Sequence, residues 1–280
     1  MNLTSSEARR MKAAMAEMFD RGAATYDRVG VEFFGPMGRE LVRRADLRPG
    51  QRVVDVGCGR GAVLLPAAAA VGPTGRAIGI DLAPRMVELT RAEARAAGLT
   101  QVQVEVADAE APPLPETAWD AVLAGLVLFL LPAPLEALRA YRRLLRPGGR
   151  VGFTTFAAHD LRFTDALRVL AQHLPDGERQ SPTAAQEGLF ATPESTAALL
   201  ETAGYRRVTV EEATFRSQFR DVEHWMTWAW SHGARALLER IPTERLPAAL
   251  ADASRVLTRV GGDLVLTTTV RFAFGVRAAQ

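Results

Sequence analysis

The stretch VVDVGCGRG, at residues 53–61, holds three glycines at alternate positions directly after an apolar run. Gly57, Gly59 and Gly61 lack a Cβ, so the backbone can approach a ligand closely. The helix predicted to follow offers free N–H groups at its start. Asp81 ends the next apolar run, where a carboxylate can accept hydrogen bonds from both hydroxyls of a ribose. The pattern predicts a binding site for a nucleoside. It fits a dinucleotide and a sulfonium compound of adenosine equally well.

Three details favour the adenosine sulfonium. The glycine spacing is GxGxG, whereas a pyrophosphate is seated by GxGxxG. Asp55, inside the run before the glycines, would repel a pyrophosphate but attract an ammonium or sulfonium. Asp108 ends a third apolar run, where it can accept a hydrogen bond from the exocyclic amine of an adenine. The alternative is a plain strand–helix–strand unit with packing glycines, and three acidic residues on three successive strands argue against it.

Hydrophobic periodicity predicts the elements that position these residues. Short apolar runs predict strands, and longer amphipathic stretches between them predict helices. The strands are expected at 52–57, 76–81, 101–108, 119–128 and 150–156, with helices at 61–71, 84–98 and 134–149. This alternation predicts an α/β fold, a parallel sheet with helices on both faces.

The flanking segments are less regular. Thr4 and Glu7 form a capping-box pattern for an N-terminal helix, and a second helix is expected at about 36–45. Residues 157–191 show no clear period. Beyond them we expect a helix from Thr192–Pro193 to Gly204, a strand at 206–212, helices at about 221–240 and 243–260, and a long final strand at 264–276.

Composition excludes several functional classes. The net charge is +2, and arginines alternate with acidic residues, which is typical of a solvated surface and gives little support for nucleic-acid binding. The N-terminus lacks the apolar core of a signal peptide, and the longest apolar stretch is too short for a membrane span. Cys58 is the only cysteine, so no internal disulfide can form. We therefore expect a cytoplasmic protein with no membrane partner.

Four stretches occur in an order and spacing that resemble a known family: VVDVGCGRG, IGIDLAPRMVE, VADAEAPPLPETAWDAVLAG and LLRPGGRVGFTTF. At about residues 50–156, they are similar to the successive motifs of the class I S-adenosylmethionine-dependent methyltransferases. FDRGAATYDRVG, at residues 19–30, also resembles the N-terminal segment of the small-molecule branch that methylates quinones and secondary metabolites. The resemblance implies a Rossmann-like sheet of seven strands, mostly parallel with the last strand antiparallel, and a helical cap or lid.

The resemblance also implies S-adenosyl-L-methionine as cofactor, S-adenosyl-L-homocysteine as product, and a role for each matching residue. Gly57 and Gly59 would line the methionine part near Asp55, and Gly125 would offer its backbone to the ammonium. Asp81 would bind the ribose. The remaining cofactor-binding residues would be Leu82 packing on adenine, Asp108 and the Ala109 backbone reading its edge, and Tyr26 closing over the cofactor.

On this basis we expect three segments and a small-molecule acceptor. Residues 1–48 would form N-terminal helices and a lid, and 49–156 the cofactor-binding core. Residues 157–280 would complete the sheet, with substrate-covering insertions at about 157–192 and 218–262. The acceptor would be a small hydrophobic or aromatic, natural-product-like molecule, as in antibiotic biosynthesis, and the protein a monomer or homodimer. A cyclisation or other non-methyl reaction and nucleic-acid methylation are the alternatives.

The loop after the expected fourth strand argues against some types of methyl transfer. AGLVLFLLP replaces the Asn/Asp-Pro-Pro-Tyr motif of amino-methylating enzymes, and Phe129 and Leu130 stand where many small-molecule relatives carry two histidines. Only Asp160 follows the fifth strand, so we predict no metal. Methyl transfer needs alignment and water exclusion, and a base only for a protonated nucleophile. The candidate bases are His159, His224 and His232.

The segment HWMTWAWSH, at 224–232, holds three of the four tryptophans. On a continuous helix Trp225, Trp228 and His232 would share one face. Because the family inserts substrate-covering elements here, Trp225, Trp228 and Phe129 are candidate acceptor-binding residues. The alternative is a helix that uses tryptophan only to dock on the sheet.

Overall fold

One seven-stranded sheet organises the chain in a computed structural model that describes residues 4–175, 188–258 and 264–279. The strand order is β3-β2-β1-β4-β5-β7-β6, and β7 runs antiparallel to β5 and β6 while the other pairs are parallel. The strands are β1 (Arg52–Val56), β2 (Arg76–Asp81), β3 (Val102–Val106), β4 (Trp119–Ala124), β5 (Leu145–His159), β6 (Tyr205–Phe219) and β7 (Leu264–Arg277). The predicted sheet, mostly parallel with an antiparallel last strand, is confirmed.

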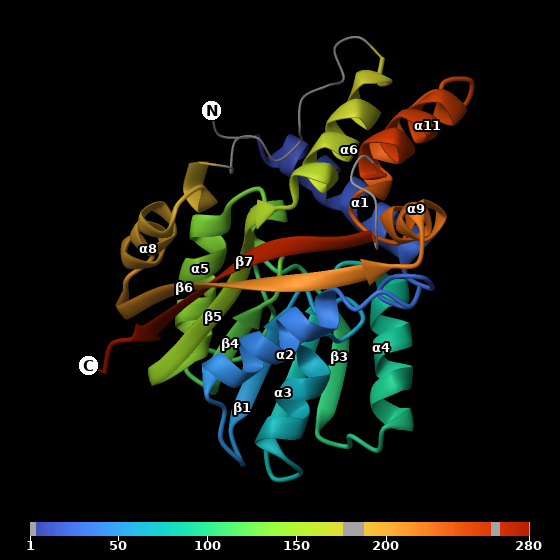
Figure 1. Cartoon of the computed structure of the whole chain (residues 1–280). Helices are drawn as coiled ribbons and strands as arrows, with labels where there is room; N and C mark the ends of the chain where they lie inside the picture. Colours follow the sequence, from blue (N-terminus) through green and yellow to red (C-terminus); the bar gives the residue numbers. More distant parts are fainter. Residues whose placement is uncertain (1–3, 176–187, 259–263, 280) are drawn as a thin grey trace.

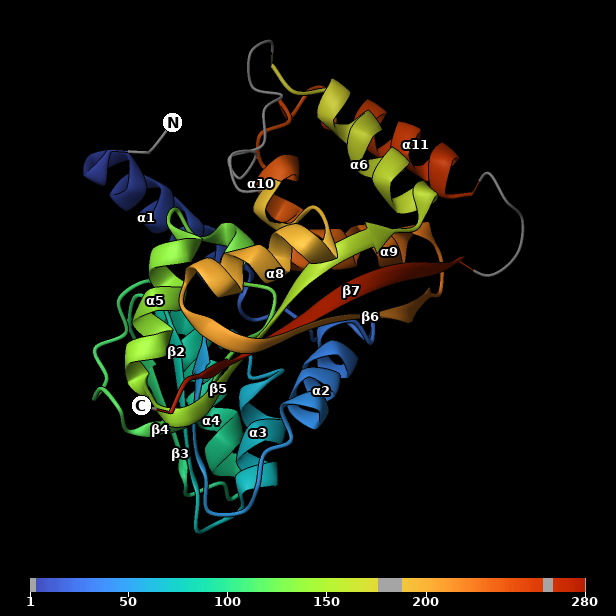
Figure 2. The ribbon, with the colours of Figure 1, turned by 90° about the vertical axis from the view of Figure 1, so that its left-hand side faces the viewer.

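Helices cover both faces of the sheet and its functional end (Figure 1). α2, α3 and α4 lie on one face, and α5 and α8 on the other (Figure 2). α1 and the cap, which we define as α6, α9, α10 and α11, lie at the carboxyl end of the parallel strands. The helices are α1 (Ser5–Gly22), α2 (Phe34–Ala45), α3 (Leu64–Val71), α4 (Pro84–Ala96), α5 (Pro134–Leu144), α6 (Leu161–Gln172), α8 (Pro193–Thr202), α9 (Val222–Ser231), α10 (Arg235–Leu238), α11 (Leu246–Leu257), and the 3₁₀ turns η1 (Leu128–Leu130) and η2 (Gly188–Phe190).

Local sequence explains where several elements begin. The capping box of Thr4 and Glu7 starts α1, with the Thr4 hydroxyl accepting from the Glu7 N–H. A second capping box, of Thr192 with Ser195, starts α8 at Pro193. The central strands β1, β2 and β4 are almost fully buried, because helices on both faces leave a parallel sheet no solvent side.

Three sequence-based expectations were wrong in detail. Residues 161–172, expected to be irregular, form α6, which begins where the Asp160 side chain accepts from the Arg162 N–H. The Pro-Gly-Gly at 147–149, expected to close a helix, lies inside β5. The helix expected at 221–240 ends at Ser231, and the chain turns at Gly233 before α10.

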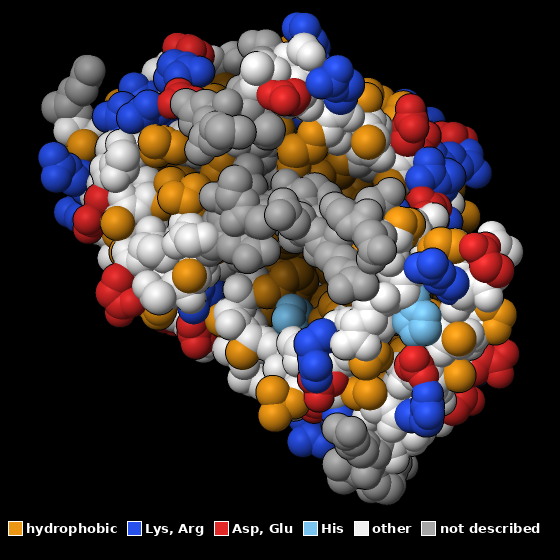
Figure 3. Space-filling view, turned by 90° about the horizontal axis from the view of Figure 1, so that it is seen from above, with side chains coloured by type: hydrophobic (Ala, Val, Ile, Leu, Met, Phe, Trp, Pro, Cys, Tyr) orange, Lys and Arg blue, Asp and Glu red, His pale blue; other side chains and the backbone are white. Residues whose placement is uncertain are grey.

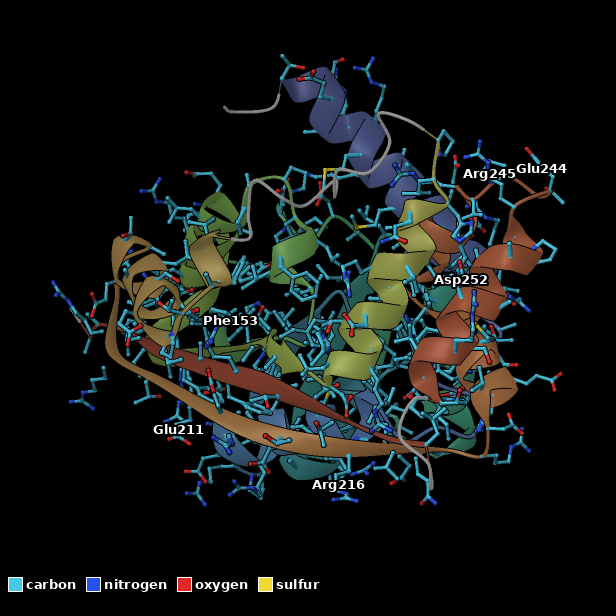
Figure 4. The ribbon with its side chains drawn as sticks, turned by 45° about the horizontal axis from the view of Figure 1, so that its top comes forward. Phe153, Glu211, Arg216, Glu244, Arg245 and Asp252 are labelled. Atoms are coloured by element: carbon cyan, nitrogen blue, oxygen red, sulfur yellow. The ribbon has the colours of Figure 1, made fainter. Side chains whose placement is uncertain are left out.

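The cap is fastened to the rest of the molecule by a shared core. Phe163 of α6 and Trp225 and Trp228 of α9 belong to the same apolar cluster as residues of α2 and α3 beneath the sheet. Within the cap, α6 and α11 lie side by side, and the His173 Nε2 atom is 2.9 Å from Oδ2 of Asp252, which Figure 4 places between the two helices. Among the described residues, no helix is both long and apolar enough to cross a membrane.

Candidate active site

The glycine-rich loop turns the chain from β1 into α3 directly above the sheet. Gly57 and Gly59 have φ of 67° and 47°, in the left-handed region that favours glycine. A Cβ at Gly57 would stand 2.5 Å from Cγ2 of Val127, so a larger residue would displace the neighbouring loop. The Cys58 N–H donates to the Ile80 carbonyl across 2.9 Å, which fixes the loop against β2. The loop therefore presents exposed backbone at the carboxyl ends of β1 and β2.

Two adjoining hollows over this loop form the cofactor cavity. They share five residues: Tyr26, Gly57, Gly59, Gly125 and Leu126. Of the nine residues proposed from the sequence to bind the cofactor, eight line one or both hollows: Tyr26, Asp55, Gly57, Gly59, Asp81, Leu82, Ala109 and Gly125. Elements from the N-terminus, β1, β2 and β4 thus converge on one cavity.

Asp55 is an unusual group at the bottom of this cavity. The side chain is 1% exposed, and neither carboxylate oxygen has a hydrogen-bond partner among the described residues. Burial, and secondarily the Asp81 carboxylate, raise the pKa of Asp55 well above its ordinary value. A buried carboxylate without a partner is costly, and an ammonium beside it would remove that cost. The site therefore fits a ligand that carries a cationic amine at this end.

Asp81 lies one strand away and is held by backbone. Its Oδ2 accepts from the Gly59 N–H at 2.8 Å and its Oδ1 from the Ala83 N–H at 2.9 Å. Burial raises the pKa of Asp81, although these two hydrogen bonds act in the opposite direction. Each oxygen keeps a further lone pair for a ligand. A fixed carboxylate at the end of β2 suits the two hydroxyls of a ribose.

Asp108 does not line the cavity described above. Its Oδ2 accepts from Lys12 Nζ at 2.7 Å, and its Oδ1 accepts from the Glu110 N–H at 2.9 Å. Lys12, the only lysine of the chain, also forms an ion pair with the Glu110 carboxylate. In this arrangement Asp108 fastens α1 to the loop after β3. Lys12 was not singled out from the sequence, because nothing local marks its distant partner.

A second cavity, of about 400 Å³, opens beside the first and is mostly apolar. It shares Phe19, Tyr26, Phe34, Leu126 and Leu130 with the cofactor cavity. Figure 3 shows a hollow at the cap end in which hydrophobic side chains surround a histidine. Apolar cavities with few polar groups are typical binding sites for small aromatic molecules. We call it the acceptor cavity.

Two of the three candidate histidines line the acceptor cavity. Burial lowers the pKa of His159 to about 4, and burial together with the nearby His159 lowers the pKa of His232 to about 3. Both imidazoles are therefore neutral at pH 7. His224 lies elsewhere, with its Nε2 atom 2.7 Å from the Val29 carbonyl and its Nδ1 accepting from the Arg220 N–H. That pattern is structural, since both nitrogens are engaged by backbone.

Of the aromatic residues proposed to bind the acceptor, some line the acceptor cavity and others do not. Phe129 and Trp228 line the cavity, whereas Trp225, with no exposed surface, does not. Trp225 instead packs against Phe163 and Trp228, with ring centroids 6.2 and 6.4 Å apart. The two tryptophans are both in the core, but only Trp228 also faces the cavity.

The remaining aromatic walls of the cavity were not foreseen. They come from segments far apart in the sequence: Phe19 of α1, Phe33 and Phe34 at the start of α2, Phe156 of β5 and Phe163 of α6. The doublet at 33–34 after the Tyr26 segment was the one available signal, because adjacent phenylalanines before a helix are unusual on a solvated surface.

No metal centre is evident in the part of the chain that the structure describes, where no three His, Cys, Asp or Glu side chains come close enough to hold an ion. Asp160, the acidic residue after β5, accepts hydrogen bonds from Arg162 instead. Metal-independent catalysis stays a prediction for the assay below.

Fold and cavity together define the class of protein. A 3-2-1-4-5-7-6 sheet with a glycine loop after β1, an unpaired buried carboxylate and a ribose-suited acid is the arrangement of a class I S-adenosylmethionine-dependent methyltransferase. The carboxylates and backbone of the cavity fit the ammonium and ribose of that cofactor.

Comparisons with known proteins agree. Residues 53–149 match the model of the methyltransferase domain family. Nocamycin O-methyltransferase of Saccharothrix syringae is 36% identical over 92% of this chain and 96% of its own. Aklanonic acid methyltransferase of a Streptomyces species (strain C5) is 43% identical over 59% of this chain and 79% of its own.

Among solved structures, the YcgJ protein of Bacillus subtilis superposes with a TM-score of 0.60 at 18% identity, covering 87% of this chain and 99% of that one, which shows the shared fold. The chain belongs to the class I S-adenosylmethionine-dependent methyltransferases, in the branch that acts on small molecules of secondary metabolism. It is an enzyme, and S-adenosyl-L-methionine is its methyl donor.

Proposed function

We propose that this enzyme methylates an oxygen atom of a flat, hydrophobic acceptor of antibiotic-type secondary metabolism. The observation that carries the proposal is the meeting of the cofactor and acceptor cavities at Tyr26 and Leu126, which line both. Oxygen as the nucleophile is supported by the nocamycin relative, whose name specifies O-methyl transfer. The aromatic lining of the acceptor cavity supports a flat, apolar substrate.

The proposed roles in the cofactor cavity follow from chemistry and position. Asp55 pairs with the ammonium of the methionine part beside Gly57, and Asp81 binds the ribose hydroxyls. Leu82 packs on the adenine, and the Ala109 backbone reads its edge. When bound, the sulfonium supplies an electrophilic methyl group and a good leaving group. The protein's task is then alignment and exclusion of water.

Leu126 fixes the point where the two cavities meet. Its φ is 54°, a left-handed value that is rare for a branched side chain, and its N–H donates to Oγ1 of Thr154 at 3.0 Å. Non-glycine residues held in such conformations concentrate at functional sites. The loop after β4 is therefore held in a fixed shape next to both ligands.

A base is required only if the acceptor oxygen carries its proton at neutral pH. His159 and His232 are both neutral and both line the acceptor cavity, and we assign this role to His159, whose Nδ1 has only a long contact with the Thr268 hydroxyl. As functional segments we propose residues 1–48 as a lid, 49–156 as the cofactor-binding core and 157–280 as the acceptor-binding part. A cytosolic location and a monomeric or homodimeric state complete the proposal.

The test is turnover with isotopically labelled cofactor. The protein is incubated with S-adenosyl-L-methionine carrying a ¹³C methyl group, in EDTA, with a panel of flat hydroxylated or carboxylated polycycles that includes aklanonic acid. Formation of S-adenosyl-L-homocysteine reports transfer, and the ¹³C chemical shift of the product methyl distinguishes O-, N- and C-methylation. We expect an O-methyl product formed without added metal.

Other outcomes would contradict parts of the proposal. A product methyl on nitrogen or carbon would overturn the assignment of oxygen, and activity that appears only after magnesium is restored would overturn metal independence. Loss of acceptor without S-adenosyl-L-homocysteine would show a non-methyl reaction such as cyclisation.

A further inference from the structure

The acceptor cavity contains very few groups that can form hydrogen bonds. Of its sixteen lining residues only Tyr26, His159, Trp228 and His232 have side chains with nitrogen or oxygen atoms, and none of the sixteen carries an ionised side chain at pH 7. Any oxygen or nitrogen of a bound molecule must therefore find its partner among these four residues, the backbone or the cofactor. Tyr26 stands at the boundary with the cofactor, stacked on Phe34 with ring centroids 4.8 Å apart.

The tautomer of His232 is fixed by its own backbone. The Ala234 N–H donates to Nδ1 of His232 across 3.1 Å. A ring nitrogen that accepts a hydrogen bond carries no proton, and because this imidazole is neutral its one proton lies on Nε2. His232 is 8% exposed, and its Nε2 atom is buried with no hydrogen-bond partner among the described residues.

The His232 ring is held in place by its aromatic neighbours. Its centroid is 4.0 Å from that of Trp228, edge to face, and 6.4 Å from that of Phe33, nearly parallel. The side chain sits directly after α9, at the position where the helix expected from the sequence breaks. A held ring with an unused N–H donor is costly in an apolar wall, and a ligand oxygen would remove the cost.

His159 differs in this respect. Its Nδ1 is 3.4 Å from Oγ1 of Thr268, a long contact in which either group can donate. Its tautomer is therefore free to follow the ligand, which suits a residue that takes up a proton. His232 cannot do the same at Nε2, because that atom already carries the proton.

We propose that the Nε2–H group of His232 donates a hydrogen bond to an oxygen of the acceptor and so selects flat molecules that carry a carbonyl or deprotonated oxygen on the ring system. His232 is on this account a positioning residue and not the general base. The inference rests on the proposed function for the identity of the acceptor cavity, and it adds the chemical group that the cavity recognises.

The experiment compares two probes of the same shape, 9-fluorenone and fluorene, which differ in one carbonyl oxygen. Their dissociation constants are measured by equilibrium dialysis with the enzyme saturated by S-adenosyl-L-homocysteine. For the unaltered enzyme we expect fluorenone to bind about three- to tenfold more tightly than fluorene, the range for one neutral hydrogen bond.

Two variants separate the donor from the shape of the ring. His232→Phe keeps an aromatic ring against Trp228 and removes the N–H, so the preference for fluorenone should vanish while the affinity for fluorene stays within about twofold. His232→Gln restores a donor near Nε2 and should recover part of the preference. His173→Phe, at the surface pair with Asp252, is the matched control and should keep the full preference.

The proposal is wrong if the unaltered enzyme shows no preference, if it binds neither probe, or if His232→Phe retains the preference. Should His232→Phe fail to fold, as shown by its melting temperature, His232→Gln decides the question. A preference for fluorenone in His232→Gln supports the proposal, and its loss overturns it. Since no methyl group is transferred in the assay, a failure of the proposed O-methylation would appear in the turnover experiment and not here.

Discussion

Asp55 and Asp81 line the same cavity but differ in their hydrogen-bond partners. Asp55 has no partner among the described residues and burial raises its pKa, so a bound cation would stabilise its charged form. Asp81 is already held by the N–H groups of Gly59 and Ala83 and offers only its spare lone pairs. In the proposed binding mode Asp55 would contribute charge to the ammonium and Asp81 would contribute directed hydrogen bonds to the ribose.

Replacing Asp81 by alanine should weaken binding of S-adenosyl-L-homocysteine by about 1.5–3 kcal/mol, the range for hydrogen bonds to a charged group. Isothermal titration calorimetry gives the dissociation constant. Asp46→Ala, at an exposed carboxylate after α2, is the control and should bind normally. An unchanged constant in Asp81→Ala would remove this residue from the binding site.

The two tryptophans of α9 should separate stability from acceptor use. Trp225→Ala removes a fully buried side chain outside the cavity, and we expect a loss of about 3–5 kcal/mol in the free energy of unfolding. Trp228→Phe keeps most of the packing but alters the cavity wall, so the acceptor KM should rise severalfold while cofactor affinity is unchanged. Urea denaturation and steady-state kinetics provide the two measurements. Equal effects of Trp225→Ala and Trp228→Phe on the acceptor KM would contradict this separation of a structural tryptophan from an acceptor-binding one.

At the level of elements, α1 touches both cavities. Met15 and Ala16 line the cofactor cavity, and Phe19 lines both cavities. Lys12 ties the helix to Asp108 and Glu110, and Arg21 ties its other end to Glu239 beyond α10 across 2.6 Å. The helix is therefore a strap fastened on the cofactor side and on the cap side.

Lys12→Met should loosen this strap without unfolding the protein. A partly exposed ion pair contributes roughly 0.2–1 kcal/mol, so the backbone amides of α1 should exchange with deuterium about 1.5- to fivefold faster. Mass spectrometry of the labelled peptides gives the rates.

Lys12→Arg keeps the charge and should exchange like the unaltered protein. Amides of α3, which contains neither ion-pair partner of Lys12, provide the internal reference. Identical α1 rates in Lys12→Met and the unaltered chain would show that the ion pair does not hold the helix.

Elements with strong local signals were predicted from the sequence, and those fixed by distant contacts were not. The strands from β1 to β5 have short apolar runs, and their order follows from the motif resemblance. The helix break at His232 was missed because Trp225, Trp228 and His232 fit a helical period. The structure instead fixes His232 through Ala234 and Trp228, contacts that periodicity does not report.

At the scale of the whole molecule, the cofactor cavity and the acceptor cavity also differ in how much of each could be predicted from the sequence. Eight of the nine residues expected at the cofactor cavity line it, because most of them follow consecutive strands whose ends must meet, whereas its walls from α1 and α2 were not expected. The acceptor cavity was foreseen only at Phe129, His159, Trp228 and His232, since Phe19, Phe33 and Phe163 come from three elements whose packing is decided by tertiary contacts. Lys12 was missed for the same reason, since its partners lie almost a hundred residues away.

The buried histidines should make the stability of the fold depend on pH. The folded-state pKa of His232, about 3, lies below the unfolded value of 6.5, so below pH 6.5 the unfolded chain binds the proton first. Stability is therefore lost as the pH falls from 6.5 towards 3, by up to about 1.4 kcal/mol per pH unit for this residue. Burial affects His159 in the same direction.

The measurement is the difference in unfolding free energy between the unaltered protein and His232→Phe at pH 7.5, 6.0 and 5.0. Acidic residues titrate in both proteins and cancel. We expect the variant to gain relative stability at each lower pH, and a constant difference would show that His232 is protonated equally in the folded and unfolded states.

The position of α1 beside both cavities affects the order in which the two ligands bind and leave during a turnover. Phe19 and Tyr26 line both the cofactor cavity and the acceptor cavity, so we expect each ligand to stabilise the wall that the other one contacts. Thermodynamic reciprocity then requires each ligand to raise the affinity for the other by the same factor. From the proposed lid role of the N-terminal segment we expect a sequential, ordered kinetic scheme, with the methyl donor bound first and its demethylated form released last as the 18-residue helix α1 opens.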